Sequence, residues 1–358
     1  MSVHFSAGFR ADAPVAGIRF GVGARAETGF EVENLGCARA VVLATPDQRA
    51  QAEELAESMG NLAVGVIATA AMHTPVDISE AAVEECRTLG VDCLVAMGGG
   101  SSIGLGKAIA LRTDLPVIAV PTTYAGSEAT PVIGQSEGGQ KTTLTDMRVQ
   151  PQRIVYDPEL VATLPVGLSV TSGLNAVAHA AEAFYARDRN PLATSLAIAG
   201  IRLFAVGLPK VIDSPADLEA RGDTLMGTWH CGAVLGQVGM ALHHKLCHVL
   251  GGTFGLPHAA VHAIVLPHAI AYNEVAVPNL LAPLAEVLGA EKAGQGLFDL
   301  SARLGAPQAL TEIGFGEDEI EQAVTQALQN SYWNPRELTA SGLTALLRDA
   351  VAGRRPQS

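Results

Sequence analysis

The sequence predicts an α/β domain followed by an all-helical domain, and three observations lead to this prediction. Short apolar runs alternate with helical segments through the first half of the chain. These runs are apolar almost throughout, which is typical of parallel strands covered by helices on both faces. From about Pro165 onward the alternation stops and helix follows helix. We therefore expect a parallel sheet within residues 1–160 and a helical domain in residues 161–358.

The first half contains four predicted strands. Between them lie three segments in which apolar residues recur with helical periodicity, so these segments are predicted to be helices. The strands are expected at residues 38–45, 61–68, 91–100 and 115–123, and the helices at 46–60, 78–90 and 101–113. Ser79 is a plausible N-cap of the second helix, and Gly90 is expected to end it. In the second half, breaks are expected at short segments that contain proline.

Composition narrows the class of protein. The chain has 358 residues, which fits two domains better than one, and a net charge of −13. That charge argues against nucleic-acid partners and anionic membranes. The five cysteines form no CxxC pair, so free thiols in a reducing cytoplasm are expected. The N-terminus has no secretory signal pattern, and no uninterrupted apolar run approaches about 20 residues, so no membrane span is expected.

A glycine-rich turn follows the third predicted strand. Gly98, Gly99 and Gly100 lie at its end, and Ser101 begins the next helix. Glycine lets a ligand approach the backbone closely, and a helix N-terminus attracts phosphate. The GxGxxG and Walker spacings are both absent, and an ordinary tight turn is the alternative. The flanking strand and helix favour a pyrophosphate-binding turn.

A second polar turn follows the fourth predicted strand. Thr122, Thr123 and Tyr124 come directly after it, and Ser127 follows closely. Ligands of open parallel sheets bind beyond the carboxyl ends of the strands, so Thr122, Thr123 and Ser127 could hydrogen-bond a cofactor. A turn satisfied by its own hydroxyl groups is the equally weighted alternative.

Histidines are concentrated in the second half. Six of the ten lie between Met240 and His268. Asn175 and His179 are four residues apart on a predicted helix, and His244 and His248 repeat this spacing, so each pair shares a helix face. Together with His258 they can converge on one point. Three other histidines are expected to cap helices or fill the core: His230, His262 and His268.

These motifs resemble the iron-containing alcohol dehydrogenase superfamily over nearly the whole chain. The matching segments are "GGGS", "PTT…GSE", the N-x-x-x-H helix and "H-x-x-x-H…LPH". The resemblance implies a Rossmann-like first domain and a dehydroquinate synthase-like arrangement, with the active site in the cleft between the domains. In that superfamily an Asp and three His bind a divalent metal, and their positions match Asn175, His179, His244 and His258. The acidic ligand is an amide here, so weak or no metal binding is expected.

A narrower resemblance is to the maleylacetate reductases, the branch of the superfamily that works without metal. It rests on "PTTYAGSE" and "LHHKLCH". The resemblance implies reduction of a dicarboxylate, maleylacetate, to 3-oxoadipate by NADH or NADPH. The proton donor is left open between His243, His244, His248 and Tyr124, with histidine suited by its pKa near neutral pH. The substrate is expected to contact Asn175, His179, Lys245 and His258, with a solvated helix lysine as the equally weighted alternative for Lys245.

The protein is expected to discriminate little between NADH and NADPH. NAD-selective relatives carry an Asp where Thr45 stands, and without that carboxylate both NADH and NADPH are expected to be accepted, although Asp47 is close by. Lys141 matches a family lysine that reaches the cofactor ribose. The segment "GIRFGVGAR" resembles one that relatives use in dimer contacts, so a homodimer is expected by analogy.

Three alternatives remain at this point. One is a metal-dependent alcohol or polyol dehydrogenase, against which Asn175 argues. Another is non-redox ring closure as in dehydroquinate synthase. The third is a catalytically silent nucleotide-binding protein whose histidines serve packing.

Overall fold

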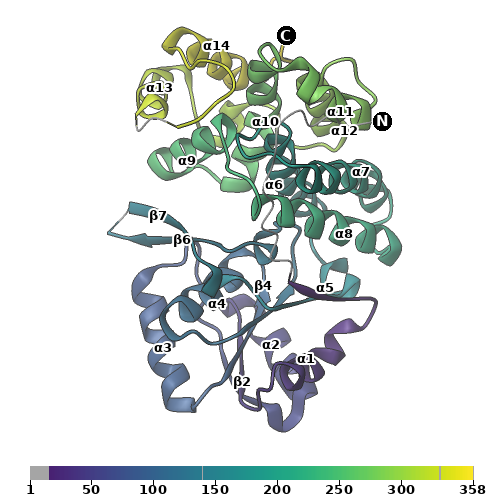
Figure 1. Cartoon of the computed structure of the whole chain (residues 1–358), viewed down its shortest axis with the longest axis vertical. Helices are drawn as coiled ribbons and strands as arrows, with labels where there is room; N and C mark the ends of the chain where they lie inside the picture. Colours follow the sequence, from purple (N-terminus) through teal and green to yellow (C-terminus); the bar gives the residue numbers. More distant parts are fainter. Residues whose placement is uncertain (1–15, 139, 330–331, 358) are drawn as a thin grey trace. The chain divides into compact units, whose positions relative to one another are not determined.

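The computed structural model describes residues 16–138, 140–329 and 332–357, and the chain divides into two compact units (Figure 1). Among the described residues, one unit comprises those up to Leu164 together with Ala216–Leu225, and the other comprises the remaining described residues. The predicted fold class, a parallel α/β domain followed by a helical domain, is confirmed. The domain limit at residues 160 and 161 and the active site in the cleft stay predictions. The segment considered for a signal peptide lies outside the described residues.

The α/β unit is built on a six-stranded sheet in the order β1-β8-β5-β4-β2-β3, in which every pair is parallel. The strands are β1 (Gly17–Phe20), β2 (Ala40–Leu43), β3 (Ala63–Ile67), β4 (Cys93–Gly98), β5 (Val117–Pro121) and β8 (Arg153–Tyr156). The four strands predicted from the sequence are therefore confirmed as β2 to β5. The sequence prediction missed β1, an edge strand, and β8, which ends the alternation.

Helices cover both faces of this sheet. The helices α1 (Thr28–Asn34) and α2 (Arg49–Met59) share a core with Val42, Val95 and Ile118. On the other face, α4 (Gly100–Thr113) approaches so closely that a Cβ on Gly106 would lie 3.0 Å from that of Ala96. Alternate residues of each strand thus face opposite layers, as a buried parallel sheet requires.

The helix α3 (Val76–Leu89) corrects one boundary prediction. Pro75 is its N-cap, and Ser79 lies inside the first turn, where its hydroxyl donates to the Pro75 carbonyl. The prediction of Ser79 as N-cap was therefore wrong, because the helix begins three residues earlier. Gly90 ends the helix with φ 63°, as predicted.

An antiparallel hairpin and a short helix complete this unit. The hairpin strands are β6 (Val132–Glu137) and β7 (Gln140–Thr145), and the helix is α5 (Pro158–Ala162), capped by the Asp157 side chain. The strands of the hairpin are mostly polar, so apolar runs did not reveal them.

The second unit is helical (Figure 1). Its helices are α6 (Val166–Ala183), α7 (Pro191–Asp213), α8 (Leu218–Leu235, whose first residues group with the α/β unit), α9 (Leu242–Phe254), α10 (His258–Glu274), α11 (Pro278–Leu288), α12 (Ala293–Arg303), α13 (Ile320–Leu328) and α14 (Ala340–Val351). The helix α10 is central: it packs against α6, α9, α12 and α14, and every residue from Val261 to Glu274 is buried.

The helix α7 qualifies one sequence expectation. By length and composition alone it could cross a membrane, the one such helix among the described residues. The same properties suit a core helix, and α7 packs closely on α8: a Cβ on Gly200 would lie 2.6 Å from the Cys231 sulfur.

Candidate active site

Five histidines gather in the helical unit. His179 comes from α6, His243 and His244 from the start of α9, and His258 and His262 from the start of α10. The ring centroids of His179 and His244 are 5.3 Å apart, those of His243 and His262 4.8 Å, and those of His258 and His262 4.4 Å. The structure therefore brings four of the predicted site residues together with a histidine that the sequence analysis placed in the core.

A buried carboxylate, Glu182, contacts His244 of this cluster. It is fully buried, and its Oε2 is 2.6 Å from His244 Nδ1. It also accepts the backbone N–H groups of Ala241 and His243, at 3.1 and 3.0 Å, and the Tyr185 hydroxyl at 2.9 Å. Burial would raise the pKa of Glu182, but the hydrogen bond from His244 and the nearby imidazoles outweigh it and lower the pKa to about 2. Glu182 is therefore an anion at neutral pH.

The Glu182 contact fixes the orientation of His244. Because Nδ1 donates to the carboxylate, Nε2 is the ring atom left for a ligand. That atom is buried and has no hydrogen-bond partner, and the same holds for Asn175 Oδ1 and His179 Nδ1. Native proteins rarely leave buried polar atoms without partners. His262 Nε2 is also buried without a partner, so four such atoms lie in the cluster and on the helical turn before His179, and they indicate a ligand site.

His262 belongs to the cluster rather than to packing alone. Its Nδ1 lies 2.9 Å from His243 Nε2, and the Cys247 sulfur is 3.6 Å from the same His243 atom. Burial lowers the pKa of His243 to about 3 and that of His262 well below its ordinary value, so both rings are neutral. The expectation of a core role gave too little weight to the position of His262, which lies four residues after His258 and therefore shares its helix face. His230 and His268 lie elsewhere, beside Trp229 and Phe298.

The other residues predicted to donate a proton or bind the substrate lie outside the histidine cluster and differ in burial and contacts. His248 is exposed on α9, and Lys245 is half-buried with its Nζ 5.7 Å from the Tyr332 ring centroid. Tyr124 belongs to the α/β unit, is fully buried, and accepts a hydrogen bond from Arg221 at 3.1 Å. Burial raises the pKa of Tyr124 to about 12, which makes its phenol a weak acid at neutral pH.

A divalent metal fits this donor set poorly. Of the four superfamily ligand positions, Asn175 supplies an amide oxygen, and the other three supply imidazoles. Among the described residues, the His, Cys, Asp or Glu set whose ligand atoms lie within 4.8 Å of one another is His243, Cys247 and His262. Two of those nitrogens already share a proton, and burial raises the pKa of the Cys247 thiol well above its ordinary value, so the thiolate that metals prefer is disfavoured.

The glycine-rich turn is tightly built in the α/β unit. Gly98 has φ 142°, and a Cβ there would lie 2.3 Å from the Ser102 hydroxyl. A Cβ on Gly99 would meet Thr123 at 2.9 Å, whereas one on Gly100 would meet nothing within 4 Å. Gly100 and Ser101 begin α4, so open space lies beside a helix N-terminus, as phosphate binding requires.

The polar turn after β5 borders the glycine-rich turn. Thr122 N donates to the Gly98 carbonyl at 3.1 Å, and the hydroxyls of Ser102 and Ser127 are buried without partners. Thr45 is half-buried after β2, while Asp47 is exposed. Lys141 lies in β7, and its side chain is outside what the structure describes.

Two residues of this region were not singled out from the sequence. Gln48 donates through Nε2 to the Thr122 hydroxyl at 3.0 Å. Lys107 is buried, and its ammonium contacts the carbonyl oxygens of Ser127, Thr130 and Val132 at 2.6 to 2.8 Å. Lys107 therefore stabilises the end of the polar turn and the residues after it through hydrogen bonds to their carbonyl oxygens. The sequence signal for Glu182 is its position three residues after His179, which puts both side chains on one face of α6.

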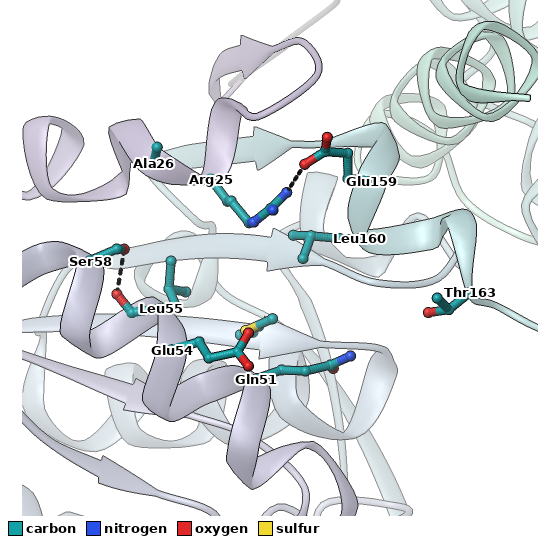
Figure 2. Close-up of a pocket in the computed structure, with 10 residues that line it drawn as sticks. Arg25, Ala26, Gln51, Glu54, Leu55, Ser58, Glu159, Leu160 and Thr163 are labelled. Carbon is teal, nitrogen blue, oxygen red and sulfur yellow. Dashed lines mark hydrogen bonds and ion pairs between the residues drawn. The ribbon is translucent and has the colours of Figure 1, made fainter. Parts of the chain in front are cut away.

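A cavity of about 260 Å³ lies elsewhere in the α/β unit (Figure 2). Gln51, Glu54 and Ser58 of α2 line it, opposite Arg25 and Glu159, which form an ion pair. None of the predicted site residues lines it.

Comparisons with known proteins agree with this architecture. Residues 16–158 match the model of the iron-containing alcohol dehydrogenases, and residues 169–351 match the C-terminal model of the same family. A maleylacetate reductase from Rhizobium sp. (strain MTP-10005) is 54% identical over 96% of this chain and 97% of its own length.

Solved structures give the same result. The crystal structure of a maleylacetate reductase from Agrobacterium tumefaciens is 53% identical, with a TM-score of 0.96, and the match covers 98% of this chain and all of that one. An iron-containing alcohol dehydrogenase from Corynebacterium glutamicum is 39% identical, with a TM-score of 0.92 and coverage of 97% and 98%. The chain therefore belongs to the iron-containing alcohol dehydrogenase family, whose members are NAD(P)-dependent oxidoreductases.

Proposed function

We propose that this protein reduces maleylacetate to 3-oxoadipate with NADH or NADPH. Relatives named maleylacetate reductase, 43 to 54% identical over nearly the whole chain, support the substrate. The observation that carries the chemistry is the Glu182–His244 pair, with the unpartnered atoms of Asn175 and His179 beside it.

The reaction is a conjugate reduction. When bound, the nicotinamide would supply a hydride to the alkene carbon β to the ketone, and the electron pair of the C=C bond would move to the ketone oxygen as an enolate. A proton then adds to the α carbon, which restores the ketone. The protein must bind a dianion, stabilise negative charge on one oxygen and deliver one proton.

His244 is best placed for the last two tasks. Its Nδ1 proton is held by Glu182, so a second proton on Nε2 can be donated to the enolate. The Asn175 side chain and His179 would orient the ketone, while Lys245 and His258 would contact the carboxylates. His243 and His248 remain alternative donors. Tyr124 is less suited, because its phenol is buried against Arg221.

We also propose that no metal takes part. The amide of Asn175 brings no negative charge to a cation, and the three other ligand positions, His179, His244 and His258, supply neutral imidazoles that leave the charge of the ion uncompensated. A second candidate is a metal-dependent alcohol dehydrogenase. The specific observation in its favour is that a carboxylate behind a histidine, as Glu182 lies behind His244, is also typical of metal-bound histidines.

The nucleotide would bind to the α/β unit. Its pyrophosphate would lie at the start of α4, and hydroxyl groups and Lys141 would contact the remainder. The proposed cofactor-binding residues are Thr45, Gly98, Gly99, Gly100, Ser101, Thr122, Thr123, Ser127 and Lys141. Because Thr45 is not a carboxylate, NADPH is not repelled, and we expect both nucleotides to be accepted.

A spectrophotometric assay tests the function. Purified protein mixed with NADH and maleylacetate should consume the absorbance of the reduced nicotinamide, and NADPH should also serve. His244→Ala should lower turnover about 10²- to 10³-fold. His230→Ala is the matched control, because its ring lies outside the cluster. Near-wild-type turnover in the Ala variants of His243, His244 and His248 would refute the assignment.

We propose further that the protein is a homodimer. The edge strand β1 and the residues after it expose Ile18, Phe20 and Val22, and an exposed apolar edge favours pairing with a second copy. Phe20→Asp should shift sedimentation toward the monomer. A wild-type protein that sediments as a monomer at micromolar concentration would contradict this proposal.

A further inference from the structure

The short 3-10 turn after β2, Pro46–Gln48, carries a residue whose role goes beyond the motif glycines and threonines. We infer that Gln48 is a positioning residue that aims the Thr122 hydroxyl proton at the nucleotide. This inference rests on the proposed nucleotide site in the α/β unit.

Gln48 joins three turns at the carboxyl edge of the sheet. Its Nε2 donates to Thr122 Oγ1, after β5, at 3.0 Å. Its Oε1 lies 3.5 Å from the Thr45 hydroxyl, after β2, and 2.8 Å from where a Cβ on Gly98, at the end of β4, would stand. Ligands of open parallel sheets bind at this edge. One half-buried amide therefore contacts all three turns that border the proposed site.

The direction of the hydrogen bond matters. A hydroxyl has two lone pairs and one proton, and the Gln48 amide occupies a lone pair of Thr122. Thr122 is only 6% exposed, and among the described residues its hydroxyl has no acceptor for its own proton. The proton is therefore available to an acceptor supplied by the ligand, and a phosphate or ribose oxygen is an acceptor of this kind.

Replacing the donor at position 48 by an acceptor should reverse the Gln48–Thr122 hydrogen bond. A Glu carboxylate can only accept, so it would take the Thr122 proton for itself and add negative charge beside the phosphates. A Leu would fill similar space without donating. The side chain of Gln51 lies one turn along and contacts Gln48 at 3.4 Å, so Gln51→Glu adds the same charge nearby without touching Thr122.

The test measures dissociation constants of NADH and NADPH for the full-length protein by nucleotide fluorescence, with thermal melting on the same samples. A single hydrogen bond of this kind corresponds to about 2- to 10-fold in affinity. Gln48→Leu and Thr122→Val should each weaken NADH binding by that factor at unchanged melting temperature. The double variant should be no weaker than Thr122→Val alone, because both changes remove the same interaction. Gln48→Glu should weaken NADPH binding more than NADH binding, and Gln51→Glu should bind both like the wild type.

Several outcomes would overturn the inference. Effects of Gln48→Leu and Thr122→Val that multiply in the double variant would mean that Gln48 acts independently of Thr122. Wild-type affinity in Gln48→Leu would remove its role, and equal losses in Gln48→Glu and Gln51→Glu would reduce it to nearby charge. A wild-type protein that binds neither nucleotide would instead refute the proposed nucleotide site.

Discussion

Replacing Asn175 by Asp should turn the histidine cluster into a metal site. Asn175 is 8% exposed, its Oδ1 has no partner, and His179 follows it by one helical turn. Without metal, the new carboxylate would be a buried charge without a compensating partner, and such a charge costs roughly 3–5 kcal/mol unless it takes up a proton. The metal-free variant should therefore unfold more readily than the wild type.

Zinc should restore that stability. A ligand that binds only the folded state stabilises it by about 2.7 kcal/mol at 100 times its Kd. For a unit of this size, 1 kcal/mol corresponds to a shift of roughly 2–4 °C in Tm. Asn175→Asp should thus gain roughly 5–10 °C in Tm on addition of zinc. The wild type should shift by less than about 2 °C, because it offers the ion an amide and neutral rings.

Differential scanning fluorimetry across a zinc titration, with elemental analysis of the dialysed protein, measures both quantities. Asn175→Asp combined with His244→Gln is the control, because it keeps the carboxylate and removes an imidazole; it should lose most of the shift. A wild type that retains one ion per chain and loses turnover when the ion is removed would refute the reasoning, whatever the variant does.

Three further predictions concern the buried carboxylate of the cluster, the glycine-rich turn and a buried histidine outside both sites. Glu182→Gln removes the charge that His244 contacts. It should therefore destabilise the protein by roughly 3–5 kcal/mol in urea unfolding and lower turnover at least about 10-fold. Unchanged stability would contradict the role of the Glu182–His244 pair. Gly100→Ala should raise the KM for NADH at least about 10-fold with an unchanged Tm, since its methyl group meets no protein atom within 4 Å and projects toward the proposed pyrophosphate; an unchanged KM would displace the phosphate from this turn. Burial lowers the pKa of His268 in the folded protein to about 4. Between pH 6.5 and 4 the unfolded chain therefore binds more protons at this residue than the folded chain does. The free energy of unfolding should fall as pH falls through this range, by up to about 1.4 kcal/mol per pH unit for this group. His268→Leu should remove that share of the slope in urea unfolding at pH 7, 6 and 5, and an equal slope in both proteins would contradict it.

The sheet could be predicted where apolar runs alternate with helical segments, which holds for the half-buried edge strand β3 as well as for the buried strands β2, β4 and β5. The strands β2 to β5 are apolar throughout, and this pattern needs no tertiary information. The edge strand β1 alternates buried and exposed residues over only four positions, and the hairpin of β6 and β7 is mostly polar. A signal that depends on apolar runs is weak in both cases, so these strands were missed. The interior strand β8 was missed because its apolar run is only three residues long.

The candidate site could be predicted only within single helices. The four-residue spacing placed Asn175 and His179 on one face of α6. The partners that give these residues their chemistry are distant in sequence: Glu182 and His244 are 62 residues apart, and Gln48 and Thr122 are 74 apart. Such pairs depend on how the helices and strand ends pack. No periodicity in the chain encodes them.

The balance of buried charge connects these observations. Glu182 is the carboxylate that contacts the cluster, and backbone N–H groups, a phenol and His244 already surround it. One proton on His244 Nε2 brings one positive charge against that single negative charge, which leaves the pair neutral. A divalent cation in the same place would leave an excess positive charge among buried neutral rings, at a cost of several kcal/mol. A second carboxylate at position 175 would cancel that excess. Loss of the acidic ligand and reliance on a protonated histidine are therefore two aspects of one electrostatic arrangement, and the zinc response of Asn175→Asp measures both.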